Sequence, residues 1–150
     1  MSSIINRPVI DEINQSYEVD ELHTKVNKQR CCITYAINRK TKQVIDFVIG
    51  NLTKENLAKV IETVLHLTPK RIYTDKLITY KSIIPSSIHN TARYQTNRIE
   101  RFNLNLRTHI KRLNRKTICY SKRKVMLEAV LRIYFWGHST NFNATSYRLT

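Results

Sequence analysis

Three acidic residues stand out because each lies among residues that are otherwise basic or apolar. Glu100 is the only acid between Asp75 and Glu128, and residues 93–124 hold eleven Lys and Arg residues around it. Asp75 ends a short apolar run, and Asp20 lies within a run of alternating apolar residues. Carboxylates are the hard oxygen ligands that Mg²⁺ prefers. Two such ions about 4 Å apart can activate an attacking oxygen and stabilise a leaving oxygen in phosphodiester chemistry.

Each acid also has a simpler interpretation. Asp20 could be a charge on an edge strand, Asp75 a turn residue or helix cap, and Glu100 the partner of Arg107 in an ion pair. Taken together, in so basic a chain, the three acids favour a shared site. The sequence therefore predicts that Asp20, Asp75 and Glu100 bind two Mg²⁺ or Mn²⁺ ions.

The net charge narrows the class of partner. The chain has 26 Lys and Arg residues against 11 Asp and Glu residues, a formal charge of +15. A field of this sign suits a polyanion, either nucleic acid or an anionic membrane surface. No apolar run approaches the 18 or so residues of a membrane helix, and the N-terminus lacks the apolar segment of a secretory signal. We expect a nucleic-acid partner, no membrane, and a cytoplasmic, nucleoid-associated protein.

The elements that must position the acids follow from the hydrophobic period. Alternation predicts strands at 17–26, 31–37 and 43–49, and the short polar turns between them indicate an antiparallel meander. The spacing over 53–65 predicts a helix. Residues 71–75 then form a strand, which we expect to lie parallel to an earlier strand because a helix connects the two. In that arrangement Asp20 and Asp75 converge.

The second half of the chain is mainly helical. Helices are predicted at 77–84, 95–114 and 121–136, with a minor strand at 89–93. On the middle helix, Glu100, Asn103 and Arg107 share one flank at three- and four-residue spacing. The resulting order is an α/β fold in which a mixed sheet has three leading antiparallel strands, a parallel fourth strand and flanking helices. The RNase H-like fold has this order, although the pattern alone leaves other folds open. Residues 17–137 form this domain, between an extension at 1–16 and a tail at 138–150.

Three blocks of sequence resemble a known family. The segment from Tyr94 to Arg107, with the segment from His109 to Lys122, resembles the signature block of insertion-sequence-1 family transposases. Ile72-Tyr-Thr-Asp75, followed by Tyr80, resembles the second acidic motif of that family. Val19-Asp-Glu-Leu22, followed by Gln29-Arg30 and Tyr35-Ala-Ile-Asn-Arg39, resembles the first. The 24 residues between Asp75 and Glu100 match its D-D-E spacing.

The resemblance implies a DDE transposase with an RNase H-like catalytic core. Such an enzyme would cut the 3′ ends of its element by metal-assisted hydrolysis and join them to target DNA by direct transesterification. Carried over, the triad falls on Asp20, Asp75 and Glu100. Asp11-Glu12 is a competing first acidic pair, which we reject because Gln29-Arg30 aligns with Asp20. The resemblance also implies a homo-oligomer on DNA. It further implies a partner, an upstream-frame DNA-binding protein that supplies the family's zinc-finger and helix-turn-helix region.

Basic residues around the acids are the predicted DNA contacts. Arg98, Arg101 and Arg107 flank Glu100 and could clamp phosphates, or they could form a solvated helix face. Further residues predicted to follow a DNA backbone are Lys111, Arg112, Arg115, Lys116 and Lys122. Asn103 could orient a metal ligand or be a plain polar position. Two alternatives remain open: another RNase H-like nuclease, or a non-catalytic, basic DNA-binding remnant of a transposase.

Overall fold

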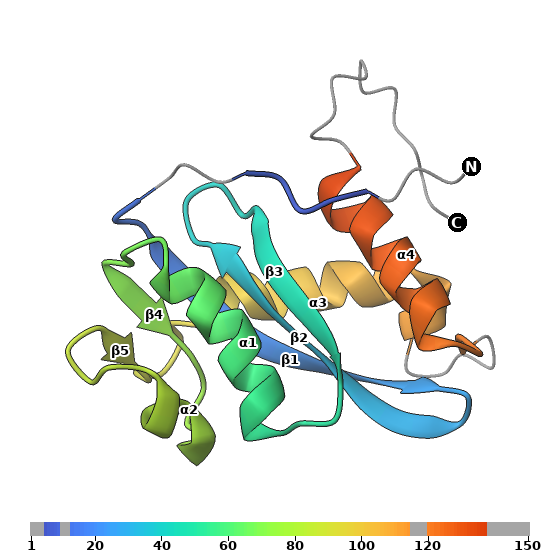
Figure 1. The fold of residues 1–150 in the computed structure, drawn as a ribbon, viewed down its shortest axis with the longest axis horizontal. Helices are drawn as coiled ribbons and strands as arrows, with labels where there is room; N and C mark the ends of the chain where they lie inside the picture. Colours follow the sequence, from blue (N-terminus) through green and yellow to red (C-terminus); the bar gives the residue numbers. More distant parts are fainter. Residues whose placement is uncertain (1–4, 10–12, 115–119, 138–150) are drawn as a thin grey trace.

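A five-stranded mixed sheet with helices on both faces forms the body of the molecule (Figure 1). The computed structural model describes residues 5–9, 13–114 and 120–137. Its elements are β1 (Ser16–Val26), β2 (Gln29–Asn38), β3 (Val44–Gly50), α1 (Lys54–Leu65), β4 (Arg71–Tyr73), α2 (Ile78–Ile83), β5 (His89–Asn90), α3 (Asn97–His109), the 3₁₀ turn η1 (Lys111–Leu113) and α4 (Lys124–Trp136). The strand order is β3-β2-β1-β4-β5.

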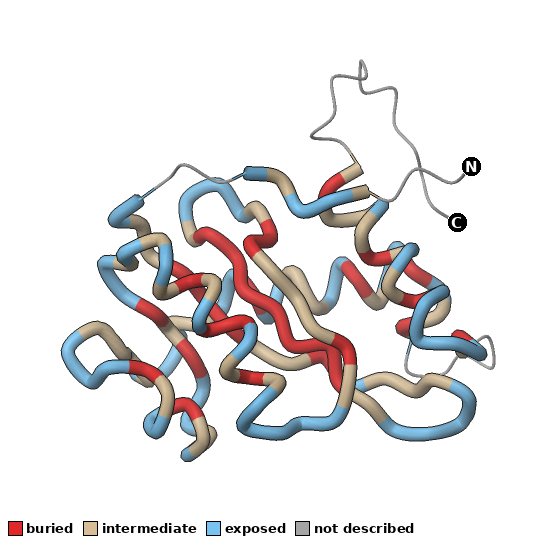
Figure 2. Tube along the Cα trace, in the orientation of Figure 1, coloured by how far each residue is buried: buried red, intermediate tan, exposed pale blue. Residues whose placement is uncertain are grey.

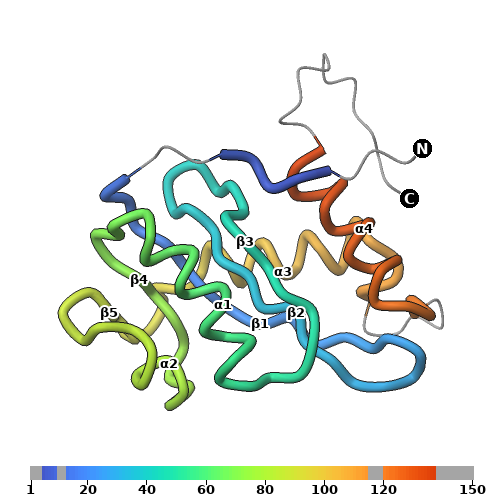
Figure 3. The backbone as a smooth tube through the Cα atoms, in the orientation of Figure 1, coloured from blue at the N-terminus to red at the C-terminus, as the bar shows by residue number. Residues whose placement is uncertain are grey.

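The first three strands form the predicted meander. β1 and β2 pair antiparallel from Tyr17↔Asn38 to Val26↔Gln29, and β3 pairs antiparallel with β2. Asn27 and Lys28 connect β1 to β2 with φ angles of 49° and 65°. Two successive residues with positive φ are the signature of the tight hairpin turn that matches strand twist. The β1–β2 hairpin therefore continues as a regular ribbon past the other strands (Figure 3).

The fourth strand is parallel to the first, as predicted, and it is short. Thr53 caps α1 by accepting a hydrogen bond from the amide of Asn56 at 3.2 Å, and α1 carries the chain across the sheet to β4. Only the pairs from Ser16↔Arg71 to Glu18↔Tyr73 join β1 to β4. Beyond Glu18, the edge of β1 that faces away from β2 has no strand beside it in the described parts of the chain. A single parallel bridge, Val26↔Ser121, closes its far end.

Two apolar clusters hold the helices against the sheet. α3 and α4 cover the face that carries Leu22, Ile33 and Tyr35, whereas α1 and α2 cover the face that carries Tyr17 and Val19. The buried residues run along the central strands and the inner sides of the helices (Figure 2). Such burial is the main favourable contribution to folding. β1 thus has a side chain facing α3 at every second residue, and Asp20 is in that set.

Trp136 belongs to the core. Its side chain is 2% exposed, and its indole N–H donates to the carbonyl of Val44 at 2.9 Å. A buried indole needs such a partner. No helix in the described ranges is long and apolar enough to cross a lipid bilayer.

The predicted helix over 95–114 is in fact interrupted. α3 ends at His109, Ile110 adopts an extended conformation, and η1 follows. Ile110 and Leu113 are nevertheless both buried, at 4% and 2% exposure. A spacing of three residues serves an α-helix and a 3₁₀ turn equally, so periodicity could not separate the two. The last helix similarly begins at Lys124 rather than Ser121, because Ser121 bridges to Val26.

Candidate active site

Three carboxylates meet at the point where β4 ends. The register that pairs Glu18 with Tyr73 continues toward Asp20 and Asp75, which follow two residues later on each chain segment. Asp20, Glu21 and Asp75 each offer a carboxylate oxygen, and these oxygens all lie within 4.8 Å of one another. The structure therefore brings two of the three predicted acids together, and it adds Glu21.

Asp20 is held in place by a chain of hydrogen bonds. The side-chain amide of Asn103, on α3, donates to Asp20 Oδ2 at 2.8 Å. The hydroxyl of Tyr35 donates to Asn103 Oδ1 at 2.5 Å and so fixes which way that amide points. Tyr35 is itself fully buried on β2, directly opposite Asp20 in the sheet. The arrangement gives the Asp20 carboxylate a defined orientation.

The surroundings of Asp20 disfavour its charged form. Burial raises the pKa of the Asp20 carboxyl, and the nearby charge of Asp75 raises it further. Hydrogen bonds from the backbone at Glu21 and from Asn103 act against that rise. A bound cation would stabilise the ionised form of this carboxylate and so offset the cost of ionising it in a partly buried place.

Glu21 is a member of the cluster that strand alternation does not predict. It points toward α2, where the hydroxyl of Tyr80 donates to Glu21 Oε1 at 2.5 Å. Burial raises the pKa of Glu21 to about 7, with the charges of Asp20 and Asp75 adding to the effect of burial and the Tyr80 hydrogen bond opposing it. Adjacent residues of a strand normally face opposite sides. Here the carboxylates of Asp20 and Glu21 both reach the edge of β1 that β4 leaves unpaired. The signal in the sequence was the Asp20-Glu21 pair itself.

Asp75 combines a structural role with its place in the cluster. It is exposed, and its Oδ1 accepts a hydrogen bond from the amide of Leu77 at 3.0 Å, just before α2 begins. This hydrogen bond agrees with the simpler interpretation of Asp75 as a turn residue. The bond occupies one oxygen and leaves the carboxylate beside Asp20 and Glu21.

Glu100 lies outside the group of three carboxylates. It is exposed in the first turn of α3, and its Oε1 accepts a hydrogen bond from the hydroxyl of Thr96 at 2.9 Å. Asn103, which contacts Asp20, follows three residues later on the same helix. Because residues three apart share one helix flank, Glu100 is about one turn from the residue that touches the cluster. Its role as the third acid stays a prediction.

A buried ion pair anchors the start of α3 to the sheet. Glu18 is fully buried, and its Oε1 accepts a hydrogen bond from the backbone amide of Arg98 at 3.2 Å. Arg39 approaches the other oxygen of Glu18 at 3.6 Å. Burial raises the pKa of Glu18, and the charge of Arg39 opposes that rise. These contacts fix α3 along β1, so that Asn103 meets Asp20.

The predicted DNA contacts are spread around this helix. Arg98, Arg101, Lys111 and Lys122 are exposed, and Arg107 and Arg112 are half-buried. Arg107 donates to the carbonyls of Leu113 at 3.2 Å and His23 at 3.5 Å. Arg115 and Lys116 lie outside the described residues. Contact with DNA remains a prediction for all of these residues.

Comparison with solved structures identifies the fold. The catalytic core domain of HTLV-2 integrase, in a structure with magnesium, matches 91% of this chain and 94% of its own, with a TM-score of 0.57 and 13% identity. The integrase of a simian T-cell lymphotropic virus intasome gives a TM-score of 0.61 at 17% identity, over 97% of this chain and 55% of that one. These cores are RNase H-like, so the predicted fold class is confirmed.

Sequence comparison identifies the family. The insertion element iso-IS1n protein InsB of Shigella dysenteriae is 36% identical over 69% of this chain and 79% of its own length. The IS1 4 protein InsB of Escherichia coli K12 is 33% identical over 67% of this chain, and the match spans 60% of that relative's length. The IS1 transposase family model matches residues 15–140. The predicted family is thereby confirmed: this chain belongs to the IS1 transposase family.

Proposed function

We propose that this chain carries the catalytic domain of a DNA transposase that cuts and joins DNA strands with two divalent metal ions. The observation that carries the proposal is the convergence of Asp20 and Asp75, whose oxygens lie within 4.8 Å together with Glu21, in a chain of charge +15. Membership of the IS1 transposase family supports the same activity.

The donor set fits Mg²⁺ or Mn²⁺. All the candidate ligands are carboxylates, and both Asp20 and Glu21 have raised pKa values because burial, together with the nearby charge of Asp75, disfavours their ionised forms. Asp20 and Asp75 would hold one ion between them. Bound ions would stabilise the charge that develops on the attacking and leaving oxygens. Mg²⁺ usually keeps several waters and takes only one or two carboxylates, so this site has enough ligands.

Glu100 is proposed as the third acid on two grounds. It stands at the D-D-E spacing of the family motif, with 24 residues between it and Asp75. It also lies on the helix whose Asn103 already contacts Asp20. To take part, its carboxylate would have to give up the hydrogen bond from Thr96.

The protein's own residues would bind and orient the DNA. Asn103 holds Asp20, and exposed Arg98 and Arg101 would take phosphates next to the site. In the first reaction a water oxygen bonds to phosphorus and the bond from phosphorus to the 3′ oxygen breaks, which leaves a 3′ hydroxyl. In the second reaction that hydroxyl attacks a target phosphodiester, and the target's 3′ oxygen leaves. We also propose that the chain acts as a homo-oligomer and with an upstream-frame DNA-binding protein.

The test uses the full chain, supercoiled plasmid and an oligonucleotide with a free 3′ hydroxyl. With Mg²⁺ or Mn²⁺ we expect nicking of the plasmid and joining of the oligonucleotide to it. Asp20→Asn should abolish both, whereas Glu62→Gln, an exposed acid on α1, should change neither. Nicking without joining would favour a nuclease. Salt-sensitive DNA binding with no metal-dependent reaction would favour a non-catalytic DNA-binding module.

A further inference from the structure

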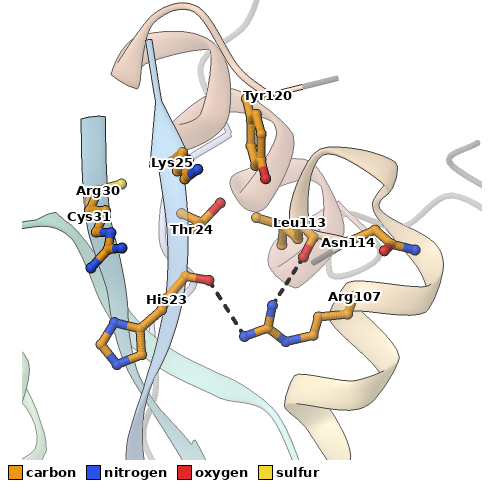
Figure 4. A pocket seen from close by; sticks show the side chains of 9 residues that line it. All are labelled: His23, Thr24, Lys25, Arg30, Cys31, Arg107, Leu113, Asn114 and Tyr120. Atoms are coloured by element: carbon orange, nitrogen blue, oxygen red, sulfur yellow. Dashed lines mark hydrogen bonds between the residues drawn. The ribbon is translucent and has the colours of Figure 1, made fainter. Parts of the chain in front are cut away.

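A basic pocket lies on the same strand as the carboxylate cluster, further along β1. It is a hollow of about 390 Å³. The end of the β1–β2 hairpin forms one wall, and the end of α3 with the segment after it forms the other (Figure 4). Its basic lining residues are Lys25, Arg30 and Arg107, and Tyr120 stands over it. No acidic residue lines it among the residues that the structure describes.

The two hairpin cations are set side by side by the sheet. Lys25 and Arg30 are directly paired across β1 and β2. The ammonium of Lys25 lies 5.3 Å from the centre of the Tyr120 ring. Within the described ranges, neither cation forms an ion pair with a carboxylate of the chain. Like charges paired across a strand repel each other, so an anion placed between them would be favoured.

A second hollow extends this basic surface. It has a volume of about 500 Å³ and is lined by Arg112, Lys122 and Arg123, and it shares Tyr120 with the first. The two hollows together present six cations, Lys25, Arg30, Arg107, Arg112, Lys122 and Arg123, with no described acid between them. A surface of several cations in neighbouring hollows suits a chain of phosphates better than one small anion.

The position of this surface relative to the acids fits a strand of DNA. Lys25 follows Asp20 by five residues on β1, a distance of about 16 Å along an extended strand. Single phosphates of one DNA strand follow each other about every 3.4 Å along the helix axis, so about five nucleotides span that distance. A strand whose phosphodiester lies at the carboxylates would thus pass the hollow.

We infer that the pocket around Lys25, Arg30 and Tyr120 binds backbone phosphates of the DNA strand that enters the proposed active site. The inference rests on the proposed function in that DNA is the substrate. The contact reads no bases, because it is made to phosphates by Lys, Arg and Tyr side chains. It goes beyond the predicted contacts of α3, since β1 and β2 supply the first two cations.

The test measures binding of the full chain to a 30-base-pair duplex of arbitrary sequence, about three turns of DNA, by fluorescence anisotropy without metal. The variants are Lys25→Gln with Arg30→Gln and, as a control with the same loss of charge, Lys54→Gln with Lys59→Gln on α1, where both lysines are exposed. Removing two phosphate contacts should weaken binding about tenfold at low salt and reduce the slope of log Kd against log salt by about 2. The control variant should change neither the affinity nor the salt slope by more than about a fifth of these amounts.

Three outcomes decide the matter. Equal effects of the two double variants would overturn the inference, because the charge would then act only at long range. If thermal melting shows that the Lys25→Gln, Arg30→Gln variant does not fold, the Lys122→Gln, Arg123→Gln variant must show the same loss of DNA affinity. The binding assay contains no metal, so it is independent of cleavage. A chain that binds DNA as expected but never cuts it would contradict the proposed function and would still support the phosphate-binding pocket.

Discussion

Two stretches of one strand, the middle of β1 and its far end, carry opposite charge in opposite surroundings. The middle holds Asp20 and Glu21, half-buried beside the end of β4 and below α3. The far end holds Lys25, which faces an open hollow with exposed Arg30. The first stretch crowds carboxylates that are partly shielded from water, where a bound cation would offset their repulsion. The second leaves like charges in water, where a polyanion can reach them.

The shortness of β4 creates this contrast. β4 pairs with β1 only as far as Glu18, so the rest of that edge is free of strand partners in the described chain. Asp75 follows β4 and sits at the place where the edge becomes free. One rigid strand therefore fixes the spacing between the proposed reacting phosphodiester and the basic pocket. A longer β4 would cover both.

The largest expected effect is at the acid stretch. Asp75→Asn should lower metal-dependent nicking and joining by about 10³-fold or more, because it removes a ligand and one of the negative charges that would hold the metal ions. Binding of DNA without metal should stay within about threefold or become tighter, since the net charge becomes more positive. Gel assays of plasmid nicking with anisotropy on the same preparation measure both. If the variant lost DNA binding and activity in parallel, Asp75 would not act in catalysis separately from DNA binding, which would contradict the prediction.

The next comparison separates the two candidates for the third ligand. If Glu100 completes the site, Glu100→Gln should cost about 10²-fold or more in nicking and Glu21→Gln about tenfold or less. Both changes preserve shape and remove one charge, so each serves as the control for the other. The reverse order would transfer the role to Glu21, which already lies within the cluster.

A smaller effect is expected from the residue that orients Asp20. Asn103→Ala removes the amide donor at 2.8 Å from Asp20 and should weaken Mn²⁺ binding about 10- to 100-fold, as loss of a supporting contact usually does. Calorimetric titration with Mn²⁺ measures the affinity directly. The matched control is Asn105→Ala, an exposed position on the same helix. Equal affinities of the two variants would mean that the Asn103 contact does not matter for metal.

The smallest effect concerns stability without metal. The pKa of Glu21 is about 7 when folded, against an ordinary value of 4.5, so the folded chain holds a proton that the unfolded chain has lost. The free energy of unfolding should therefore fall as pH rises from about 5 to 7.5. Glu21→Gln should recover about 1–2 kcal/mol at pH 7.5, after allowance for solvent screening, and little at pH 4.5. Urea denaturation at both pH values measures this, and a pH-independent gain would refute it.

Much of the fold followed from local patterns. Asp20 lies on the same face of β1 as Leu22, two residues away, and both face α3. The turn at Asn27 and the helix cap at Thr53 depend only on residues close by in the sequence. The end of β1 and the start of α1 could therefore be predicted to within about a residue. Convergence of Asp20 with Asp75 needed one further rule, that a strand reached through a helix lies parallel to its neighbour.

The remaining features depend on contacts that no local pattern encodes. Glu21 joins Asp20 only because β4 stops at Tyr73 and leaves the edge open. The side chain of Glu100 takes Thr96 as its partner, a choice among nearby donors that spacing does not decide. The basic pocket forms because Ser121 bridges to Val26 and so brings Tyr120 over Lys25. These residues lie almost a hundred positions apart in the sequence.

The most direct test of the proposed active site is X-ray diffraction from crystals of the full chain soaked in Mn²⁺, with the anomalous signal used to locate the ions. We expect a Mn²⁺ ion bound by carboxylate oxygens of both Asp20 and Asp75 at about 2.2 Å. With DNA bound, we expect Glu100 to turn from Thr96 to a second ion. Mn²⁺ absent from the Asp20–Asp75 pair at a saturating concentration, or bound there with the DNA 3′ end located elsewhere, would contradict the proposed active site.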